Sequence, residues 1–145
     1  MKYTCETVID LPRERVIELF DNADNLSKWQ PTLKSFEHFE GELGKPGAKS
    51  RLIYNERGRE LEMIETILVR NLPDEFSATF EAKGVFNINK NIFHEAGENQ
   101  TRWVQDTEFE LSGMMKVMGI FMRGAFPKET AKGMQMFKEF AEAAN

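Results

Sequence analysis

The stretch from residue 33 to residue 111 is a succession of short segments in which apolar residues recur at every second position. That period is typical of strands whose two faces lie in different surroundings. Turn signals rich in Gly, Asn and Pro separate the segments, at residues 41–47, 55–58, 71–74, 83–84 and 97–99. Such short connections join antiparallel neighbours, because a parallel pair needs a crossover of about a dozen residues or more. The pattern predicts six antiparallel strands that follow one another as a meander.

The C-terminal segment has the spacing of an amphipathic helix. Thr130, Met134, Phe137 and Ala141 recur at intervals of four, three and four residues, with lysines on the other side. The stripe predicts a helix of about five turns. Within residues 75–82 apolar side chains alternate with polar ones, which predicts one wet face of the sheet and one face covered by this helix.

Residues 3–9 alternate as a further strand, after which the period changes. Pro12 suits the first turn of a helix over roughly residues 12–21, and residues 25–29 suit a second short helix. A length of 145 residues is the size of one domain. We therefore expect a single α+β domain over residues 1–145. Two short helices follow its first strand, and a curved antiparallel sheet of about seven strands wraps around the long C-terminal helix.

Charge and composition argue against several classes of protein. The net charge of −5 and the pI near 5.2 disfavour a nucleic-acid partner, because phosphate binding needs clustered Lys and Arg. The most apolar stretch, residues 111–122, is shorter than the roughly 20 residues that cross a bilayer, so we expect no stable membrane insertion. A lone cysteine, Cys5, and an N-terminus without an apolar leader predict a cytoplasmic location.

The chain has no recognisable pattern of metal or cofactor ligands. His38, His94 and Cys5 fall on separate expected strands, so we expect no metal site. The glycines within residues 41–47 lie in a hairpin with no helix after them, which argues against a nucleotide-binding loop. Ser35 lies near His38 in the sequence, but no nucleophile elbow surrounds it. We expect no bound cofactor.

The 12 Phe and 8 Met residues indicate either a cavity with adaptable walls or a Phe-rich core. Gln105 and Thr107 share the parity of Trp103 and Phe109 on one expected strand. They are therefore expected to face the covered side of the sheet. Buried polar groups there need hydrogen-bond partners, from protein, water or a ligand.

The orientation of two charged residues stays open. Glu65 shares the parity of Met63, but both parities of this strand carry apolar residues, so Glu65 faces either the cavity or solvent. A buried carboxyl group at this position would have a raised pKa and would suit a general acid or base. Lys90 lies between two isoleucines and is equally ambiguous.

Residues 114–126 are apolar nearly all round and are punctuated by glycines. Three interpretations remain open for this segment. It packs in the core below the long helix, it forms a flexible gate over a pocket, or it lies on a membrane surface. The last of these would require a basic face, for which only Lys116 and Arg123 are available.

The order of expected elements and several local motifs resemble the START-like or SRPBCC superfamily, whose fold is the helix-grip fold. That group includes polyketide cyclase/dehydrase proteins and lipid-transfer domains. The motifs that carry the resemblance are residues 9–16 (IDLPRERV), 26–31 (LSKWQP), 44–48 (GKPGA) and 101–110 (TRWVQDTEFE), followed by Ser112 and Gly113. The resemblance implies a cavity between the sheet and the long helix that takes lipids, polyketides or similar hydrophobic molecules. It identifies a fold and not a chemistry.

These observations lead to three hypotheses. The first is binding of a hydrophobic small molecule, with the expected ligand-binding residues Phe36, Tyr54, Met63, Phe80, Trp103, Gln105, Thr107, Met118, Phe126, Met134 and Phe137. The second is an enzyme of the cyclase/dehydratase kind, for which Glu65, Gln105 and Tyr54 are the candidate catalytic residues. The third is a protein-interaction module that resembles co-chaperone activators. The identity of the ligand and the oligomeric state stay open.

Overall fold

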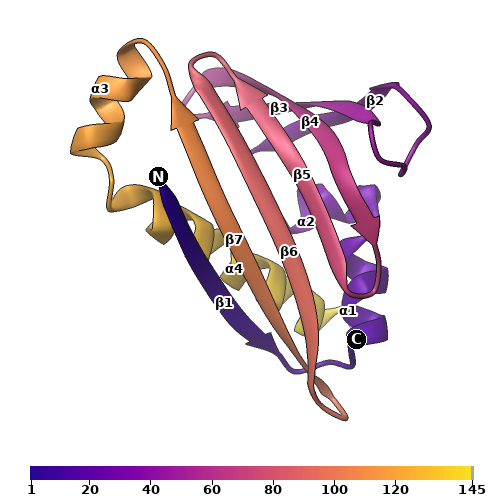
Figure 1. The fold of residues 1–145 in the computed structure, drawn as a ribbon. Coiled ribbons are helices and arrows are strands. Elements are labelled where there is room, and N and C mark those ends of the chain that lie inside the picture. The colour runs from indigo at the N-terminus through magenta and orange to yellow at the C-terminus, as the bar shows by residue number, and fades with distance from the viewer. Residues whose placement is uncertain (145) are drawn as a thin grey trace.

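Seven strands form one antiparallel sheet in the computed structural model, which describes residues 1–144 (Figure 1). Across the sheet the order is β1-β7-β6-β5-β4-β3-β2, so β2 to β7 form a meander and β1 pairs with β7. The strands are β1 (Lys2–Ile9), β2 (Leu33–Glu40), β3 (Lys49–Glu56), β4 (Arg59–Asn71), β5 (Glu75–Ala82), β6 (Val85–Gly97) and β7 (Gln100–Leu111). The predicted meander and the additional N-terminal strand are confirmed.

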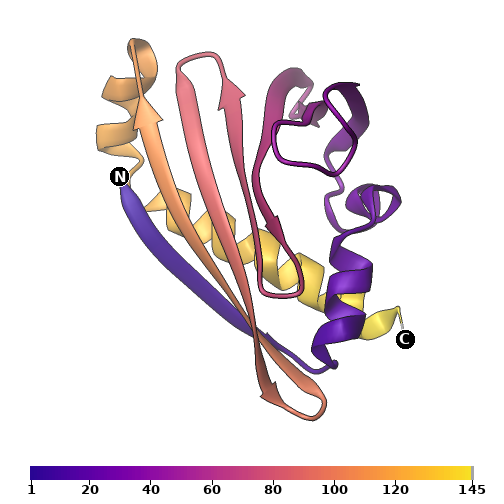
Figure 2. The ribbon, with the colours of Figure 1, turned by 45° about the vertical axis from the view of Figure 1, so that its right-hand side comes forward.

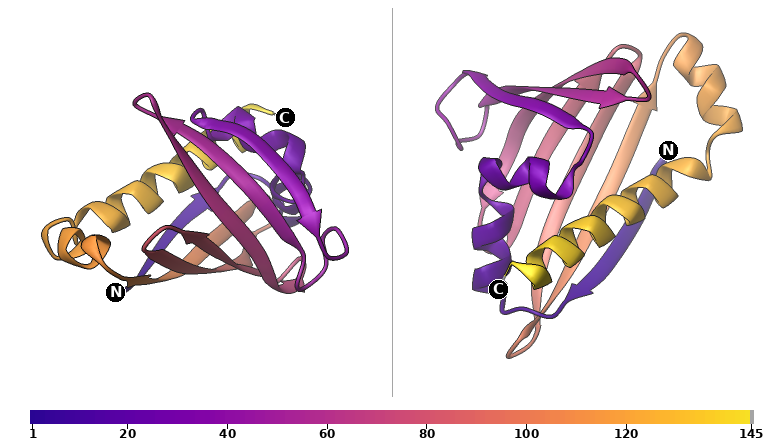
Figure 3. Two further views of the ribbon diagram at one scale, coloured as in Figure 1. Left: turned by 90° about the horizontal axis from the view of Figure 1, so that it is seen from above. Right: turned by 180° about the vertical axis from the view of Figure 1, so that it is seen from behind.

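Short helices follow β1, and a long helix closes the chain. The helices are α1 (Arg13–Phe20), α2 (Leu26–Trp29), α3 (Met114–Phe121) and α4 (Ala125–Ala143), with the 3-10 turn η1 (Ala23–Asn25) between α1 and α2. Figures 2 and 3 show α4 running diagonally across the concave face of the curved sheet, with α1 and α2 at the end of the sheet near the C-terminus of α4. The predicted helix-grip architecture is confirmed.

Hydrogen bonds hold α4 along the edge strand β1. The hydroxyl groups of Tyr3 and Thr130 lie 2.7 Å apart, and the ammonium group of Lys138 donates to the carbonyl oxygen of Val8 at 2.7 Å. These contacts join residues that are more than 100 positions apart in the sequence. The C-terminal helix α4 therefore covers the concave face of the sheet along β1 (Figure 3).

Two-residue turns determine which residues face one another across the sheet. Arg57 and Gly58 both have positive φ, 52° and 81°, which is the backbone of the tight hairpin turn that matches strand twist. This turn pairs Ser50 with Glu65 across β3 and β4. Directly opposed residues point to the same face of a sheet. The inward direction of β3 therefore sets the inward direction of β4.

The core lies where α1, α2 and α4 meet the end of β6 and the start of β7, around Phe93 and Trp103. Phe137 of α4 is completely buried, and its ring lies 5.2 to 5.8 Å from the rings of Trp29, Trp103 and Phe20. The rings meet edge to face, an arrangement that aromatic pairs favour. Phe93 packs beneath Trp103 in a stacked arrangement. This cluster closes one end of the space between sheet and helix.

The outer face of the sheet is less exposed than the alternation in β5 predicts. Ser77 and Thr79 are buried, although they lie on the parity opposite to Phe76 and Phe80. Ser77 lies directly opposite Lys90, and its hydroxyl group donates a hydrogen bond of 2.6 Å to the carboxylate of Glu75. These small polar side chains are thus buried although they lie on the outer face.

Of the three interpretations of residues 114–126, packing in the core does not hold for α3. Met114, Ile120 and Phe121 are 77%, 67% and 84% exposed, and Figure 1 shows α3 projecting from the end of β7. The helix contacts β7 through Gly119, where a Cβ atom would lie only 2.2 Å from the side chain of Leu111. Met115 also packs toward the sheet, beside Gly84, whereas the other large apolar side chains of α3 face away from it. None of the helices within residues 1–144 has both the length and the hydropathy to cross a membrane.

Candidate functional site

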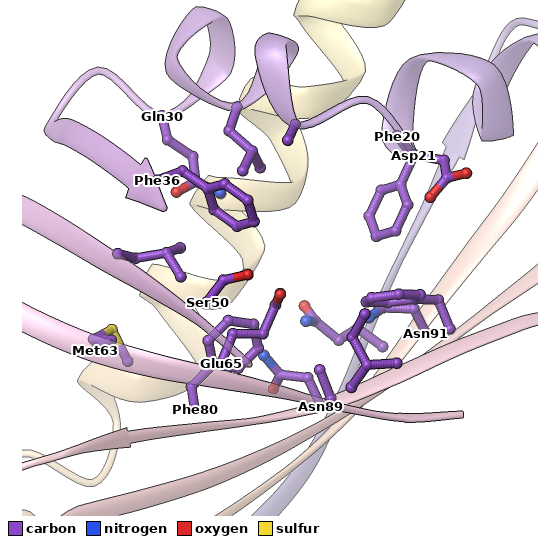
Figure 4. Close-up of a pocket in the computed structure, with 18 of the residues that line it drawn as sticks. Phe20, Asp21, Gln30, Phe36, Ser50, Met63, Glu65, Phe80, Asn89 and Asn91 are labelled. Atoms are coloured by element: carbon purple, nitrogen blue, oxygen red, sulfur yellow. The ribbon is translucent and has the colours of Figure 1, made fainter. Parts of the chain in front are cut away.

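A cavity of about 650 Å³ lies between the concave face of the sheet and helices α2 and α4 (Figure 4). Its walls come from β2 to β7, from the α1–α2 region and from α4. About half of the residues that line it are apolar or aromatic, among them Phe20, Leu26, Trp29, Phe36, Leu43, Ala48, Leu52, Met63, Ile67, Phe76, Ala78, Phe80, Trp103 and Met134. Ala78 forms part of the floor and is almost completely buried.

Several residues expected to bind a ligand line this cavity. They come from five strands and α4: Phe36, Tyr54, Met63, Phe80, Trp103, Gln105 and Met134. Tyr54 donates a hydrogen bond of 2.7 Å from its hydroxyl group to Oε1 of Gln30, which also lines the cavity. Burial, followed by the negative charges of Glu65 and Glu56, raises the pKa of Tyr54. The phenol is therefore neutral and positioned by its hydrogen bond.

Four other residues expected to bind a ligand lie outside the cavity wall. Phe137 is part of the buried core behind Trp103, and Thr107 is buried opposite Tyr3. The ring of Phe126 packs against Phe109 at 4.8 Å, outside the cavity. Met118 belongs to the outward face of α3 and is 45% exposed. Their positions depend on how α3 and α4 meet the sheet, which the spacing within each helix does not encode.

The structure settles the direction of Glu65, which the sequence left open. Glu65 lines the cavity, and Figure 4 shows its carboxyl group pointing into the open space. Ser50 lies opposite it on β3 and Phe80 opposite it on β5. Burial raises the pKa of Glu65 to about 7, with no hydrogen bond or cation to offset that effect. The carboxyl group therefore changes its charge near neutral pH. Lys90, the other ambiguous residue, is exposed on the outer face.

Three asparagines that sequence reasoning did not single out line the cavity from one strand. Asn87, Asn89 and Asn91 occupy alternate positions of β6 and all face inward. Their register follows from the hairpin to β5, which places Phe80 opposite Asn87. The turn at residues 83–84 was recognised in the sequence, so counting outward from it predicts this inward row.

Some polar atoms in the cavity wall have no hydrogen-bond partner. Among the side chains that the structure describes, the buried Oδ1 atoms of Asn87 and Asn89 and the buried Nε2 atom of His38 are of this kind. Asn91 differs, because its Oδ1 accepts a hydrogen bond of 2.9 Å from the indole of Trp103. Unpaired buried polar groups cost free energy, so these atoms are places where a ligand or water binds favourably.

An ion pair lies at the edge of the cavity. Both terminal nitrogens of the Arg70 guanidinium donate to the carboxylate of Asp21, at 2.6 and 2.5 Å. This two-pronged geometry joins the end of α1 to β4. Asp21 and Arg70 both line the cavity, so the pair contributes to its wall with no net charge.

Metal ligands do not gather at this site or elsewhere in residues 1–144. No group of three or more His, Cys, Asp or Glu side chains in this range is arranged to hold a metal ion.

Comparisons with known proteins show the class of fold. No family model matches the sequence, and a search of curated proteins gave no match. Solved structures match over nearly the whole chain. An aromatase/cyclase from Streptomyces sp. R1128 has a TM-score of 0.77 and 11% identity, covering 98% of this chain and 93% of its own. A START superfamily protein from Mycobacterium smegmatis has a TM-score of 0.75 and 13% identity, covering 99% of both chains.

A third match is norcoclaurine synthase from Thalictrum flavum, solved in complex with dopamine and hydroxybenzaldehyde. Its TM-score is 0.71 at 12% identity, covering 100% of this chain and 88% of that protein. The structural neighbours of the chain are thus START-like proteins of the SRPBCC superfamily, and the chain has their helix-grip fold. At these identities the likeness describes the fold and not the reaction.

Proposed function

We propose that this chain binds a small, largely hydrophobic molecule in the cavity between the sheet and α4. The observation that carries the proposal is the cavity itself, about 650 Å³ in volume and with about half of its lining residues apolar or aromatic. Ligand sites of proteins have volumes of roughly 300 to 1,000 Å³ and combine apolar walls with a few polar groups. Glu65, His38 and the asparagines of β6 are such groups here.

The structural neighbours support this proposal at the level of the fold. Norcoclaurine synthase has been solved with two small molecules bound, and it shares the helix-grip architecture. We infer that the same architecture serves this chain to enclose a ligand of comparable kind. The choice of ligand depends on the side chains of this particular cavity.

Binding can be tested with an aromatic alcohol and a variant that fills the cavity. We expect 4-phenylbutan-1-ol to raise the melting temperature of the protein, because a ligand that binds only the native state stabilises it. It should also change the tryptophan fluorescence, since Trp29 and Trp103 line the cavity. The substitution Ala78→Phe places a phenyl ring inside the cavity. The rise in melting temperature and the change in fluorescence should then both be lost, while the protein still folds.

The matched control for this experiment is Glu81→Phe. It adds the same ring to β5, at an exposed position on the outer face of the sheet. This variant should respond to the alcohol as the wild type does. An equal response of Ala78→Phe and the wild type would show that the alcohol binds elsewhere, and no response of the wild type to hydrophobic probes would contradict the proposal.

A second candidate function is proton transfer on a bound ketone, and Glu65 favours it. A carboxyl group with a pKa of about 7 can both accept and donate a proton near neutral pH. We expect the protein to accelerate exchange of the α-hydrogens of 2-tetralone with deuterated water, measured by NMR. Glu65→Gln should return the exchange to the rate of the buffer. Exchange that persists in this variant would exclude Glu65 as the group that carries the proton.

A further inference from the structure

The cavity wall presents hydrogen-bond acceptors around Glu65. Among the described residues, the carboxylate form of Glu65 and the unpaired Oδ1 atoms of Asn87 and Asn89 are acceptors in this wall. The hydroxyl donor of Tyr54 already bonds Gln30, and the indole donor of Trp103 already bonds Asn91. A ligand that places donors next to Glu65 therefore satisfies these acceptors, while the amide NH2 groups of the asparagines and glutamines in the wall are donors for other parts of the molecule.

The charges of the cavity point in the same direction. Among the described residues that line it, the side chains that titrate or carry charge, apart from Glu65, are Asp21, His38, Tyr54, Arg70 and Glu129. Arg70 is the cation of this set, and the carboxylate of Asp21 engages both of its terminal nitrogens. An anionic ligand such as a fatty acid would thus bring a second negative charge near Glu65 without a free arginine or lysine to pair with it.

We propose that the ligand of this cavity is a hydrophobic amine, bound as its ammonium ion against the carboxylate of Glu65. The inference rests on the proposed binding function and specifies the class of ligand. An ammonium group has donors and no acceptor, so it complements both Glu65 and the neighbouring amide oxygens of β6. It also supplies the counter-charge that this carboxylate lacks in the cavity wall.

The surroundings of Glu65 suit the remainder of such a molecule. Phe80 lies directly beside Glu65 in the sheet, and Phe36 faces the same space from β2 (Figure 4). Aromatic faces attract cations as well as apolar groups. The apolar body of the amine extends from Glu65 toward Phe20 and Trp103, where the aromatic core closes the cavity.

Binding of an amine is coupled to ionisation of Glu65. In the free protein the pKa of this carboxyl group is about 7, so below neutral pH it must release its proton when the ammonium ion binds. The amine itself stays protonated, because alkylamines titrate near pH 10, like lysine. Affinity for the amine therefore increases as the pH rises toward 7, and it levels off above that value.

Three probes with one apolar body test the inference: 4-phenylbutylamine, 4-phenylbutan-1-ol and 4-phenylbutanoate. Their affinities are measured by calorimetry on the wild type. With a pKa of about 7 for Glu65, we expect the amine to bind up to about 30-fold more tightly near pH 8 than near pH 5.5. The affinity of the alcohol should show no such increase with pH. Near pH 8 the carboxylate should bind more weakly than the other two probes.

Variants distinguish the role of Glu65 from a general effect of charge. Glu65→Gln should weaken amine binding by at least about tenfold near pH 8, because the partner of the ammonium ion is lost. Binding of the alcohol should weaken much less, because the alcohol carries no charge to pair with Glu65, and the binding that remains shows that the cavity is intact. The control Glu81→Gln removes a negative charge from the outer face of the adjacent strand and should change neither affinity.

Two results would overturn the inference. If the alcohol or the carboxylate binds as tightly as the amine near pH 8, the cavity does not select amines, although the proposed binding of hydrophobic molecules stands. If amine binding is the same in Glu65→Gln and in the wild type, Glu65 is not the partner of the ammonium ion. Failure of all three probes to bind would instead contradict the proposed function, and with it the inference.

Discussion

Phe137→Ala is expected to lower the free energy of unfolding by about 3 to 5 kcal/mol, the range typical of removing a buried phenylalanine ring. Phe137 is completely buried and contacts the rings of Phe20, Trp29 and Trp103. Its removal leaves a void among rigid aromatic neighbours that belong to three different helices and strands. The loss is measured by urea unfolding, followed by tryptophan fluorescence and by circular dichroism.

The same substitution at an exposed position provides the control. Phe121 of α3 is 84% exposed, so Phe121→Ala should change the free energy of unfolding by less than about 0.5 kcal/mol. Comparable losses in the two variants would mean that α3 packs against the body of the protein in solution. A small loss in Phe137→Ala would show that the aromatic cluster is not the main core.

Glu65→Gln is expected to stabilise the protein at alkaline pH but not at acidic pH. The folded-state pKa of Glu65 is about 7, above its ordinary value of 4.5, so the folded protein binds this proton more tightly than the unfolded chain does. The stability that Glu65 contributes is fully present below pH 4.5 and is lost as the pH rises to about 7. The total loss is about 3 kcal/mol, calculated from the difference between the two pKa values.

The measurement is urea unfolding of wild type and variant at a series of pH values. Near pH 4.5 the two proteins should have similar stability, because a neutral carboxyl group and an amide have nearly the same shape. Near pH 8 the variant should be more stable, by up to about 3 kcal/mol. Glu81→Gln, at an exposed outer-face position, should show no such pH-dependent gain. A constant difference across the pH range would mean that Glu65 does not titrate with a raised pKa.

The inward direction of the strands was largely contained in the sequence. Alternation in β5 placed Phe76, Ala78 and Phe80 on one face, and all three line the cavity. The orientation of Glu65 follows as well, once residues 57–58 are recognised as a two-residue turn. Ser50 then lies opposite Glu65, and Ser50 shares the inward parity of Leu52 and Tyr54 on β3. Polarity alone misleads in β6, where the isoleucines face outward and the asparagines face inward. The neighbouring strands dictate that register, since opposed residues share a face.

The residues of the last third of the chain were less predictable. Periodicity identified α4 and its apolar face, on which Met134, Phe137 and Ala141 are buried. It did not show that Met134 reaches the cavity whereas Phe137 lies in the core behind Trp103. That difference depends on the diagonal path of α4 across the sheet. Likewise, Met118 faces solvent because Gly119 is the residue of α3 that meets Leu111.

The sequence by itself determined the elements, their order and the antiparallel meander, because alternation, helical spacing and turn residues act between near neighbours along the chain. Only the tertiary structure decided the contents of the cavity. Curvature of the sheet and the path of α4 bring Glu65, His38 and the asparagines of β6 to the wall of one cavity. There burial raises the pKa of Glu65, and burial is a property of the whole fold rather than of any segment.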